Sequence, residues 1–250
     1  MTDNIRIAET FTLPSKGLIY DEEVNPEVTL SSMKTKHEML RLSATEDSQK
    51  IMSSIIDDCI VNDIGISSYD LCLGDFQFLM YKLRVVTFGP EYEFGTVCPY
   101  CGFENTVSVN LDEMEVKEFD NSLLDALTFK LPKSGNEITL TLQTPRIIDK
   151  NQKLAKEYKK RHKGSNENAI YLYTIVSSIA YIDGEVPDRI MLEEWVRDLP
   201  LADTNALVNR IDEINAKIGI DLGMEDNCAL CKNKFKFPFR ITSSFFRPLN

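Results

Sequence analysis

The sequence predicts an α+β protein: a small β-rich zinc-ribbon module, N-terminal strands and helices, and a helical insertion. Three observations support this fold class. Apolar residues recur at helical spacing through much of the 250-residue chain. Segments with the alternation of strands lie among them. Two Cys-x-x-Cys loops, at 98–101 and 228–231, each come shortly before strand-like sequence.

Residues 1–90 are predicted to form an N-terminal strand arm and a helical region. The segment 11–20 is apolar and is interrupted by Pro14 and Gly17, and 25–30 ends with the alternation of a strand. Apolar spacing then predicts three helices, at 35–42, 47–59 and 69–88. A Gly-Pro pair ends the last of these helices.

Residues 91–143 are predicted to form the first half of the zinc ribbon and a β hairpin. Strands at 92–97 and 103–111 flank the first cysteine loop. The segment 112–120 is acidic, so we expect it to lie exposed. A turn that contains Pro and Gly then joins two further strands, at 127–131 and 138–142.

Residues 144–223 are predicted to form a helical insertion without internal repeats. Thr144 and Pro145 begin it, since proline is favoured at the first position of a helix. Four helices are expected, at 145–162, 168–181, 187–199 and 202–218.

Residues 224–250 are predicted to supply the second half of the ribbon. The strand expected at 235–241 alternates three phenylalanines with Lys234, Lys236 and Pro238. Because successive side chains of a strand point to opposite faces, one face is apolar and the other largely cationic.

The two cysteine loops predict one shared metal site with Cys98, Cys101, Cys228 and Cys231 as ligands. The two-residue spacing lets a tight turn aim both thiolates at one tetrahedral ion. Four thiolates close the coordination shell of Zn²⁺, so the ion is expected to be structural. The alternatives are two disulfides, four unrelated buried thiols or a redox motif, which usually occurs singly.

The remaining two cysteines, Cys59 and Cys72, fall in apolar helical patterns, and we expect them to be core residues. The four loop cysteines would join an early segment of the chain to a late one. Everything between them is then an insertion.

The composition describes an acidic globular protein with a formal net charge of −11 and 43% hydrophobic residues. Such a charge repels phosphate backbones and anionic membranes. The basic run at 156–163 is interpreted as a solvated helix end. The chain start lacks the pattern of a signal peptide, and no stretch approaches 18 apolar residues, so the protein is expected in the cytoplasm where it is made.

Candidate catalytic residues are few, and the chain is predicted not to be an enzyme. His37 and His162 are expected to be surface residues. No phosphate-binding loop, nucleophile elbow or His-Glu-x-x-His motif occurs. The doublets Asp57-Asp58 and Glu193-Glu194 are interpreted as solvated helix edges, and Asp183-Gly184-Glu185 as a turn between helices. No small-molecule substrate is therefore expected.

Several motifs in order resemble one known family. They are Leu13-Pro-Ser-Lys-Gly-Leu-Ile-Tyr20, Asp57-Asp58-Cys59-Ile60-Val61, Leu73-Gly-Asp75, Phe88-Gly-Pro-Glu-Tyr92 and Cys98-Pro-Tyr-Cys101-Gly102. Together they look like the base plate protein family of T4-like contractile-tailed bacteriophages. The resemblance covers roughly the first 110 residues. No motif of the helical region 151–223 matches.

The resemblance implies a structural or assembly protein of the tail baseplate, associated with its central hub. Its partners would be other hub or tail proteins, and its location the host bacterial cytoplasm during assembly, with the virion baseplate as a further location. The alternative is a zinc-ribbon regulator that binds nucleic acid. Its support is the final segment, where Lys232, Lys234, Lys236 and Arg240 stand beside aromatic residues.

Overall fold

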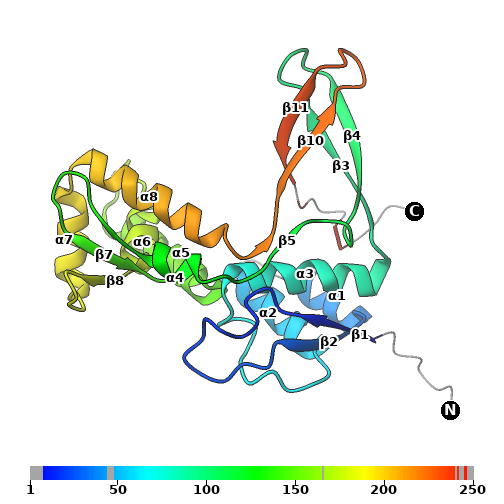
Figure 1. The fold of residues 1–250 in the computed structure, drawn as a ribbon, viewed down its shortest axis with the longest axis horizontal. Helices are drawn as coiled ribbons and strands as arrows, with labels where there is room; N and C mark the ends of the chain where they lie inside the picture. Colours follow the sequence, from blue (N-terminus) through cyan, green and yellow to red (C-terminus); the bar gives the residue numbers. More distant parts are fainter. Residues whose placement is uncertain (1–7, 44–47, 165, 240, 242–244, 247–250) are drawn as a thin grey trace.

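The computed structural model describes residues 8–43, 48–164, 166–239, 241 and 245–246. Within them the chain forms three packed parts, which Figure 1 shows as an L-shaped molecule with an upright arm. We call these parts the N-terminal lobe (8–88), the helical lobe (119–218) and the arm (91–110 with 223–239). Each part has its own hydrophobic core. The molecule is α+β, with helices beside several small sheets.

The N-terminal lobe packs a two-stranded sheet against three helices. Strand β1 (Ala8–Thr12) pairs antiparallel with β2 (Glu27–Ser31). The helices are α1 (Thr35–Leu42), α2 (Ser48–Cys59) and α3 (Leu73–Phe88). Apolar side chains from β2, α2 and α3 meet in the core, including Leu30, Ile55, Ile56, Leu79 and Leu83. These elements follow the predicted order, although the predicted first residue of α2, Asp47, lies outside the described residues.

Helix α3 begins four residues later than predicted, because a turn takes up the residues before it. The Asp70 N–H donates to the carbonyl of Ser67, and the Cys72 sulfur accepts the N–H of Asp75 at the helix start. Cys72 therefore caps the helix from outside it. Both Cys59 and Cys72 are buried, as predicted.

His37 lies buried between α1 and α2, so the prediction of a surface residue was wrong. Its Nε2 lies 2.6 Å from Oδ2 of Asp58, and its Nδ1 accepts the backbone N–H of Lys34 at 2.9 Å. Only 4% of the residue is exposed. The ring joins two helices whose proximity no local sequence pattern reveals. His162 is exposed and stacks on Tyr158 at the end of a helix, as expected for a surface residue.

The helical lobe combines five helices with a three-stranded sheet. The helices are α4 (Ser122–Leu127), α5 (Pro145–Arg161), α6 (Ala169–Ser178), α7 (Arg189–Asp198) and α8 (Leu201–Asn215). The sheet has the order β6 (Thr128–Lys130), β7 (Glu137–Leu140) and β8 (Ile179–Ile182). At the start of α5 the Thr144 hydroxyl accepts the N–H of Ile147, and Pro145 occupies the first turn, as predicted.

Strand β8 corrects the prediction of a helix at 168–181. The helix ends at Ser178, and Ile179 takes extended angles of φ −91° and ψ 116°. The strand then pairs with β7, so the hairpin of β6 and β7 packs with the helices rather than with the cysteine loops. Helix α4 was not predicted, because its six residues are too short to show a helical period.

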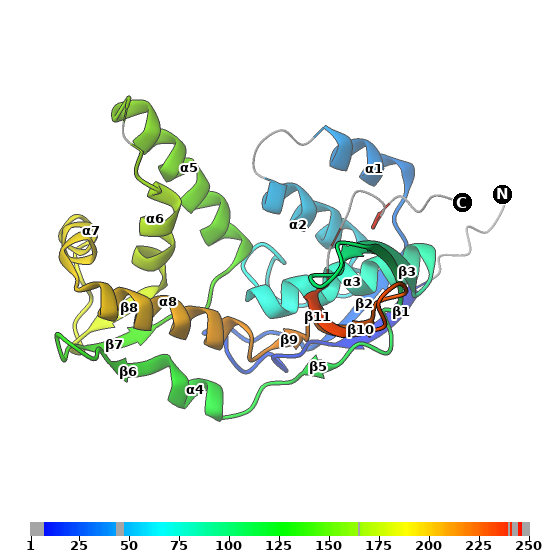
Figure 2. The same cartoon turned by 90° about the horizontal axis from the view of Figure 1, so that it is seen from above.

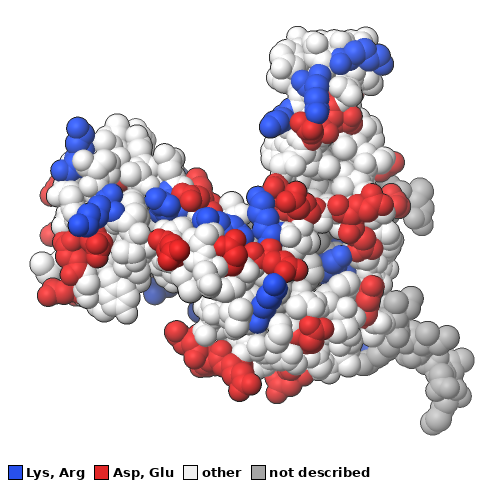
Figure 3. All heavy atoms as spheres, in the orientation of Figure 1, with Lys and Arg blue, Asp and Glu red and all other residues white. Residues whose placement is uncertain are grey.

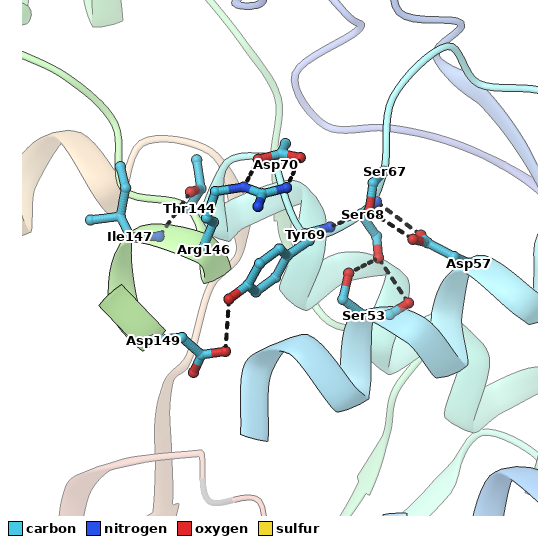
Figure 4. Close-up of polar contacts among 10 residues, drawn as sticks. All are labelled: Ser53, Asp57, Ser67, Ser68, Tyr69, Asp70, Thr144, Arg146, Ile147 and Asp149. Carbon is cyan, nitrogen blue, oxygen red and sulfur yellow. Dashed lines mark hydrogen bonds and ion pairs between the residues drawn. The ribbon is translucent and has the colours of Figure 1, made fainter. Parts of the chain in front are cut away.

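The two lobes meet where α5 crosses the start of α2 (Figure 4). The carboxylate of Asp149 on α5 accepts the backbone N–H of Lys50 at 2.9 Å and the hydroxyl of Tyr69 at 3.0 Å. Arg146 makes two hydrogen bonds to Asp70, of 2.5 and 2.6 Å, and lies over the Tyr69 ring. Asp149 thus acts as an N-cap for α2 from another helix, since orphan N–H groups at a helix start need an acceptor.

The arm consists of two antiparallel hairpins that pack face to face. Strand β3 (Glu91–Val97) pairs with β4 (Glu104–Asn110), and β10 (Gly223–Asn227) pairs with β11 (Lys234–Pro238). Their inner faces supply Tyr92, Phe94, Val107, Phe235 and Phe237 to the core. Strand β10 was not predicted, because its sequence of Gly, Met, Glu, Asp and Asn has no strand pattern of its own.

The arm stands on α3, as the view from above shows (Figure 2). The Tyr81 ring of α3 lies 5.2 Å from that of Phe239 and 5.3 Å from that of Phe245. Two segments join the arm to the helical lobe, and they pair with each other beside α3. One contains β5 (Val116–Lys117) and the other β9 (Gly219–Ile220). Gly219 has φ +105°, and a Cβ there would lie 2.7 Å from the Cα of Gly74. Glycine at both positions allows this close approach.

No helix in the described part of the chain has both the length and the apolar character needed to cross a membrane.

Candidate metal centre

Four cysteine sulfurs meet at the tip of the arm, one pair from each hairpin loop. The Sγ atoms of Cys98, Cys101, Cys228 and Cys231 all lie within 4.8 Å of one another. The sulfurs of Cys98 and Cys231 are 3.7 Å apart, and those of Cys101 and Cys228 are 3.6 Å apart. The fold therefore brings together the four residues that the sequence singled out, across more than 120 intervening residues.

These distances suit metal coordination and not disulfide bonds. Sulfurs at about 2.3 Å from a tetrahedral ion lie roughly 3.8 Å from one another, which is close to the two observed separations. A disulfide would require about 2.05 Å. All four cysteines are free, so the cluster could hold a metal ion.

The two cysteine loops have the same backbone conformation. In the first, the Cys98 N–H donates to the carbonyl of Phe103, and the Gly102 N–H donates to the carbonyl of Cys98. In the second, the Cys228 N–H donates to the carbonyl of Asn233, and the Lys232 N–H donates to the carbonyl of Cys228. Each loop closes with a left-handed residue, Gly102 at φ 72° and Lys232 at φ 61°. No local sequence pattern marks Lys232 as the counterpart of Gly102.

The first cysteine of each loop lies opposite the second cysteine of the other loop. Cys98 faces Cys231, and Cys228 faces Cys101. This exchange, together with the matching backbone, relates the two loops by a pseudo-two-fold axis through the centre of the cluster. Each hairpin then contributes two ligands from the same side, as a tetrahedral ion requires.

The thiol pKa values diverge inside the cluster. Burial of Cys228 opposes ionisation, but backbone N–H groups of Cys231 and Leu230 and neighbouring thiols lower its pKa to about 6. For Cys101, the Phe103 N–H acts to lower the pKa, but desolvation and the other thiols raise it to about 12. One thiolate thus disfavours the next. A cation is what allows all four sulfurs to be ionised together.

Cys59 takes part in a second arrangement with the residue types of a nucleophilic site. Its sulfur lies 3.5 Å from Nδ1 of His37, whose Nε2 contacts Asp58. Burial raises the Cys59 pKa to about 11, and the residue has no exposed surface. Nδ1 already accepts the Lys34 N–H. A nucleophile needs access and an ionised sulfur, so this geometry fits a core contact.

The acidic doublets serve local structure. Asp57 accepts the Ser67 hydroxyl at 2.7 Å and the Ser68 N–H at 2.9 Å, and Glu193 pairs with Arg189. Asp183 holds a turn by accepting the N–H of Glu137. The sequence predicted a turn between two helices. In the structure the turn follows strand β8, so that part of the prediction was wrong.

The alternative prediction of nucleic-acid binding rested on cationic and aromatic residues of the final segment. In the structure the cationic residues lie on the surface and the aromatic ones in the core. Lys234 and Lys236 are exposed, and Lys234 forms an ion pair with Glu225. Phe235, Phe237 and Phe239 are buried against the other hairpin, so they are not available to stack on bases. Arg240 lies outside the described residues.

A groove of about 1050 Å³ lies at the inner corner of the L, away from the cysteines. Its walls come from the end of α8, the β5–β9 pair and the base of β10 and β11. Leu73, Ile218, Leu222 and Phe237 are among its apolar residues, and the ion pair of Lys117 and Asp221 lies along it. It contains none of the candidate metal ligands.

Comparison with known proteins gives one family. Neither the curated proteins nor the solved structures contain a match. The family model described as T4 bacteriophage base plate protein matches residues 6–247, nearly the whole chain. The match extends beyond the region of the sequence resemblance and includes the helical lobe and both cysteine loops. The chain therefore belongs to the T4 bacteriophage base plate protein family, whose members have a structural role in the phage tail baseplate.

Proposed function

We propose that this chain is a component of the baseplate hub whose arm is fixed by one Zn²⁺ ion bound to Cys98, Cys101, Cys228 and Cys231. The observation that carries the proposal is the convergence of four free thiols from two matching loops. Their spacing suits a tetrahedral S₄ shell, which is typical of structural zinc.

In this function the metal contributes stability and no reaction. Four sulfur ligands leave no open position for water or substrate. The ion links β3 and β4 to β10 and β11 at the tip, while the aromatic core and α3 hold the base. The arm is thereby a rigid projection that presents protein surfaces to neighbouring subunits. Assignment to the hub rests on the sequence resemblance, as does assembly in the host cytoplasm.

Zinc measurement on the purified full chain tests the metal site. We expect one zinc per chain by elemental analysis, and near-complete loss in Cys101→Ser and in Cys228→Ser. Cys72→Ser is the matched control, because this cysteine lies in another core and caps a helix. Full zinc content in Cys228→Ser would show that the two loops do not share an ion.

Co-purification tests the hub assignment independently of the metal. The tagged chain is recovered from infected cells and, in parallel, from purified virions, and its partners are identified by mass spectrometry. Hub proteins are expected in the first sample. Recovery of peripheral baseplate proteins without hub proteins would contradict the assignment, while the virion sample shows whether the chain remains in the finished particle.

A further inference from the structure

The outer surface of α5 carries a dense positive charge in a strongly acidic protein. Residues 145–163 contain eight Lys and Arg and two Asp and Glu, for a net charge of +6. The whole chain has a net charge of −11, so the rest of it has a net charge of −17. Helix α5 spans about 25 Å at 1.5 Å per residue. Its charge is therefore a continuous ridge and not a single capped end.

The ridge faces solvent, because α5 packs its opposite side on α6 and α2. Asp149 and Asn151 are buried on that inner side. Lys150, Lys159 and Lys160 are exposed, and no ion pair among the described residues involves them. Figure 2 shows α5 beside α6, at an edge of the helical lobe, running away from α2 and apart from the arm. We call this surface the basic ridge.

The complementary charge lies on the first hairpin of the arm and the connection that follows it. Residues 91–120 contain eight Asp and Glu and one Lys, for a net charge of −7. Buried and exposed residues alternate along β3. Tyr92 and Phe94 are buried, so Glu91 and Glu93 point outward. In Figure 3 acidic side chains gather around the base of the arm. We call the outward face of β3 with residues 112–115 the acidic face.

The two surfaces do not neutralise each other within one molecule. The ion pairs of α5 with other elements include Arg146 with Asp70, in the N-terminal lobe. No ion pair in the described residues joins the basic ridge to the acidic face. Glu91 and Glu93 likewise have no ion-pair partner there. Lys150, Lys159 and Lys160 on the ridge are thus available to a different molecule, as are Glu91 and Glu93 on the acidic face, whereas Asp112 there already pairs with Lys82.

We infer that the basic ridge of one copy docks on the acidic face of a second copy, in a head-to-tail arrangement. Because the two surfaces differ, the contact is heterologous, and repetition of it gives a ring or an open chain. A nucleic acid is the less favoured occupant, since the field of the remaining −17 charge repels a phosphate backbone. The docking does not depend on the identity of the bound metal.

Sedimentation of the full-length protein across a concentration range tests this inference. At about 50 mM salt we expect a mass above that of the 28.5 kDa monomer, and at about 500 mM salt a return toward it, because salt screens exposed charges. Lys150→Glu with Lys160→Glu, and Glu91→Lys with Glu93→Lys, are each expected to weaken association at least about tenfold. The matched control is Lys130→Glu with Lys133→Glu, which changes the net charge equally on another exposed segment.

Mixing distinguishes a head-to-tail contact from general charge effects. Each variant alone has two surfaces of like charge, whereas a mixture offers complementary surfaces, so an equimolar mixture is expected to regain association with the two variants in equal amounts. The variant with all four reversals is expected to regain association. Zinc is measured in every sample, so that loss of metal is not mistaken for loss of docking.

A wild-type protein that stays monomeric at low salt would overturn the inference, as would equal effects of the ridge and control variants. The ridge would be assigned to nucleic acid instead if the wild type is monomeric and binds duplex DNA, and if only the ridge variant loses this binding.

Discussion

Asn105 on β4 accepts, at its Oδ1 atom, the backbone N–H of Ala229 in the second cysteine loop, at 2.8 Å. The amide also donates to the carbonyl of Phe103 in the first loop, and only 7% of the residue is exposed. One buried side chain therefore holds both loops, although it contributes no ligand. Nothing local in the sequence distinguishes this asparagine from others in a strand, so its role was not predictable.

Asn105→Ala is expected to weaken metal binding without removing a ligand. Groups that position metal ligands typically contribute 10–100-fold in affinity. Competition with a chelator, followed by release of zinc, measures the change. Asn105→Asp keeps an acceptor for Ala229 and is expected to lose less. Unchanged affinity in Asn105→Ala would mean that the ligands alone fix the loops.

Metal removal is expected to loosen the arm and leave the two lobes folded. The binding free energy of a structural metal is also folding free energy, and the arm has a core of its own. Hydrogen exchange after chelation should show lost protection at 91–110 and 223–239, with little change in α5 and α6. Protection lost across the whole chain would show that the three cores unfold as one unit.

Lys232→Gly is expected to stabilise the second loop, and Gly102→Ala to destabilise the first. A non-glycine residue in the left-handed region costs roughly 1 kcal/mol or more. A Cβ on Gly102 would meet nothing within 4 Å, so its effect is conformational alone. Thermal denaturation of the zinc-loaded variants measures both changes. If both substitutions lower the melting temperature, the side-chain hydrogen bond from Lys232 to Ala229 outweighs the strain.

Asp149→Ala is expected to destabilise the contact between the lobes by roughly 1–2 kcal/mol, the usual effect of removing an N-cap. The substitution leaves the N–H of Lys50 without its acceptor. Urea denaturation gives the free energy of unfolding. Asp149→Asn retains a capping oxygen and serves as the conservative variant. Asp70→Ala, which removes an exposed ion pair, is expected to cost less than about 1 kcal/mol.

The buried carboxyl of Asp75 predicts a pH dependence of stability. Burial raises its pKa, although Ser15 and Tyr20 donate hydrogen bonds that act in the opposite direction. A raised pKa means that the folded state holds the proton more tightly than the unfolded state. The protonated Asp75 carboxyl therefore makes its full contribution to the free energy of unfolding below about pH 4. This contribution is lost as the pH rises through the folded-state pKa.

Asp75→Asn tests this dependence, because the amide does not titrate. Other carboxylates, such as Asp203 and Asp221, have lowered pKa values and give the opposite trend. The measured quantity is therefore the difference in unfolding free energy between the wild type and Asp75→Asn from pH 4 to 8. The wild type should lose stability relative to the variant as the pH rises. A constant difference would contradict the raised pKa.

Elements that depend on local signals were predictable from the sequence. Thr144 and Pro145 set the start of α5, and the breaks after Phe88 and Arg161 set two helix ends. The grouping of four cysteines was also predictable, since the spacing within each loop already prepares two ligands. The identity of the ion is not encoded as directly, and zinc remains part of the proposed function.

Features that depend on distant partners were not predictable. Strand β10 exists because β11 pairs with it, and β8 because β7 offers an edge beside Ile179. The burial of His37 follows from the approach of α1 to α2, which its polar neighbours in sequence do not suggest. In each case a contact made far along the chain decides the conformation of a segment with weak preferences of its own.

The separation of the two halves of the arm has a consequence for the order of synthesis. A ribosome releases β3, β4 and the first two thiols well before the helical lobe, and β10, β11 and the other thiols only after it. The arm therefore cannot close during most of translation, and both lobes have time to fold first. The projection is thus completed late, and a baseplate neighbour that binds it would engage only chains whose synthesis has passed the end of β11.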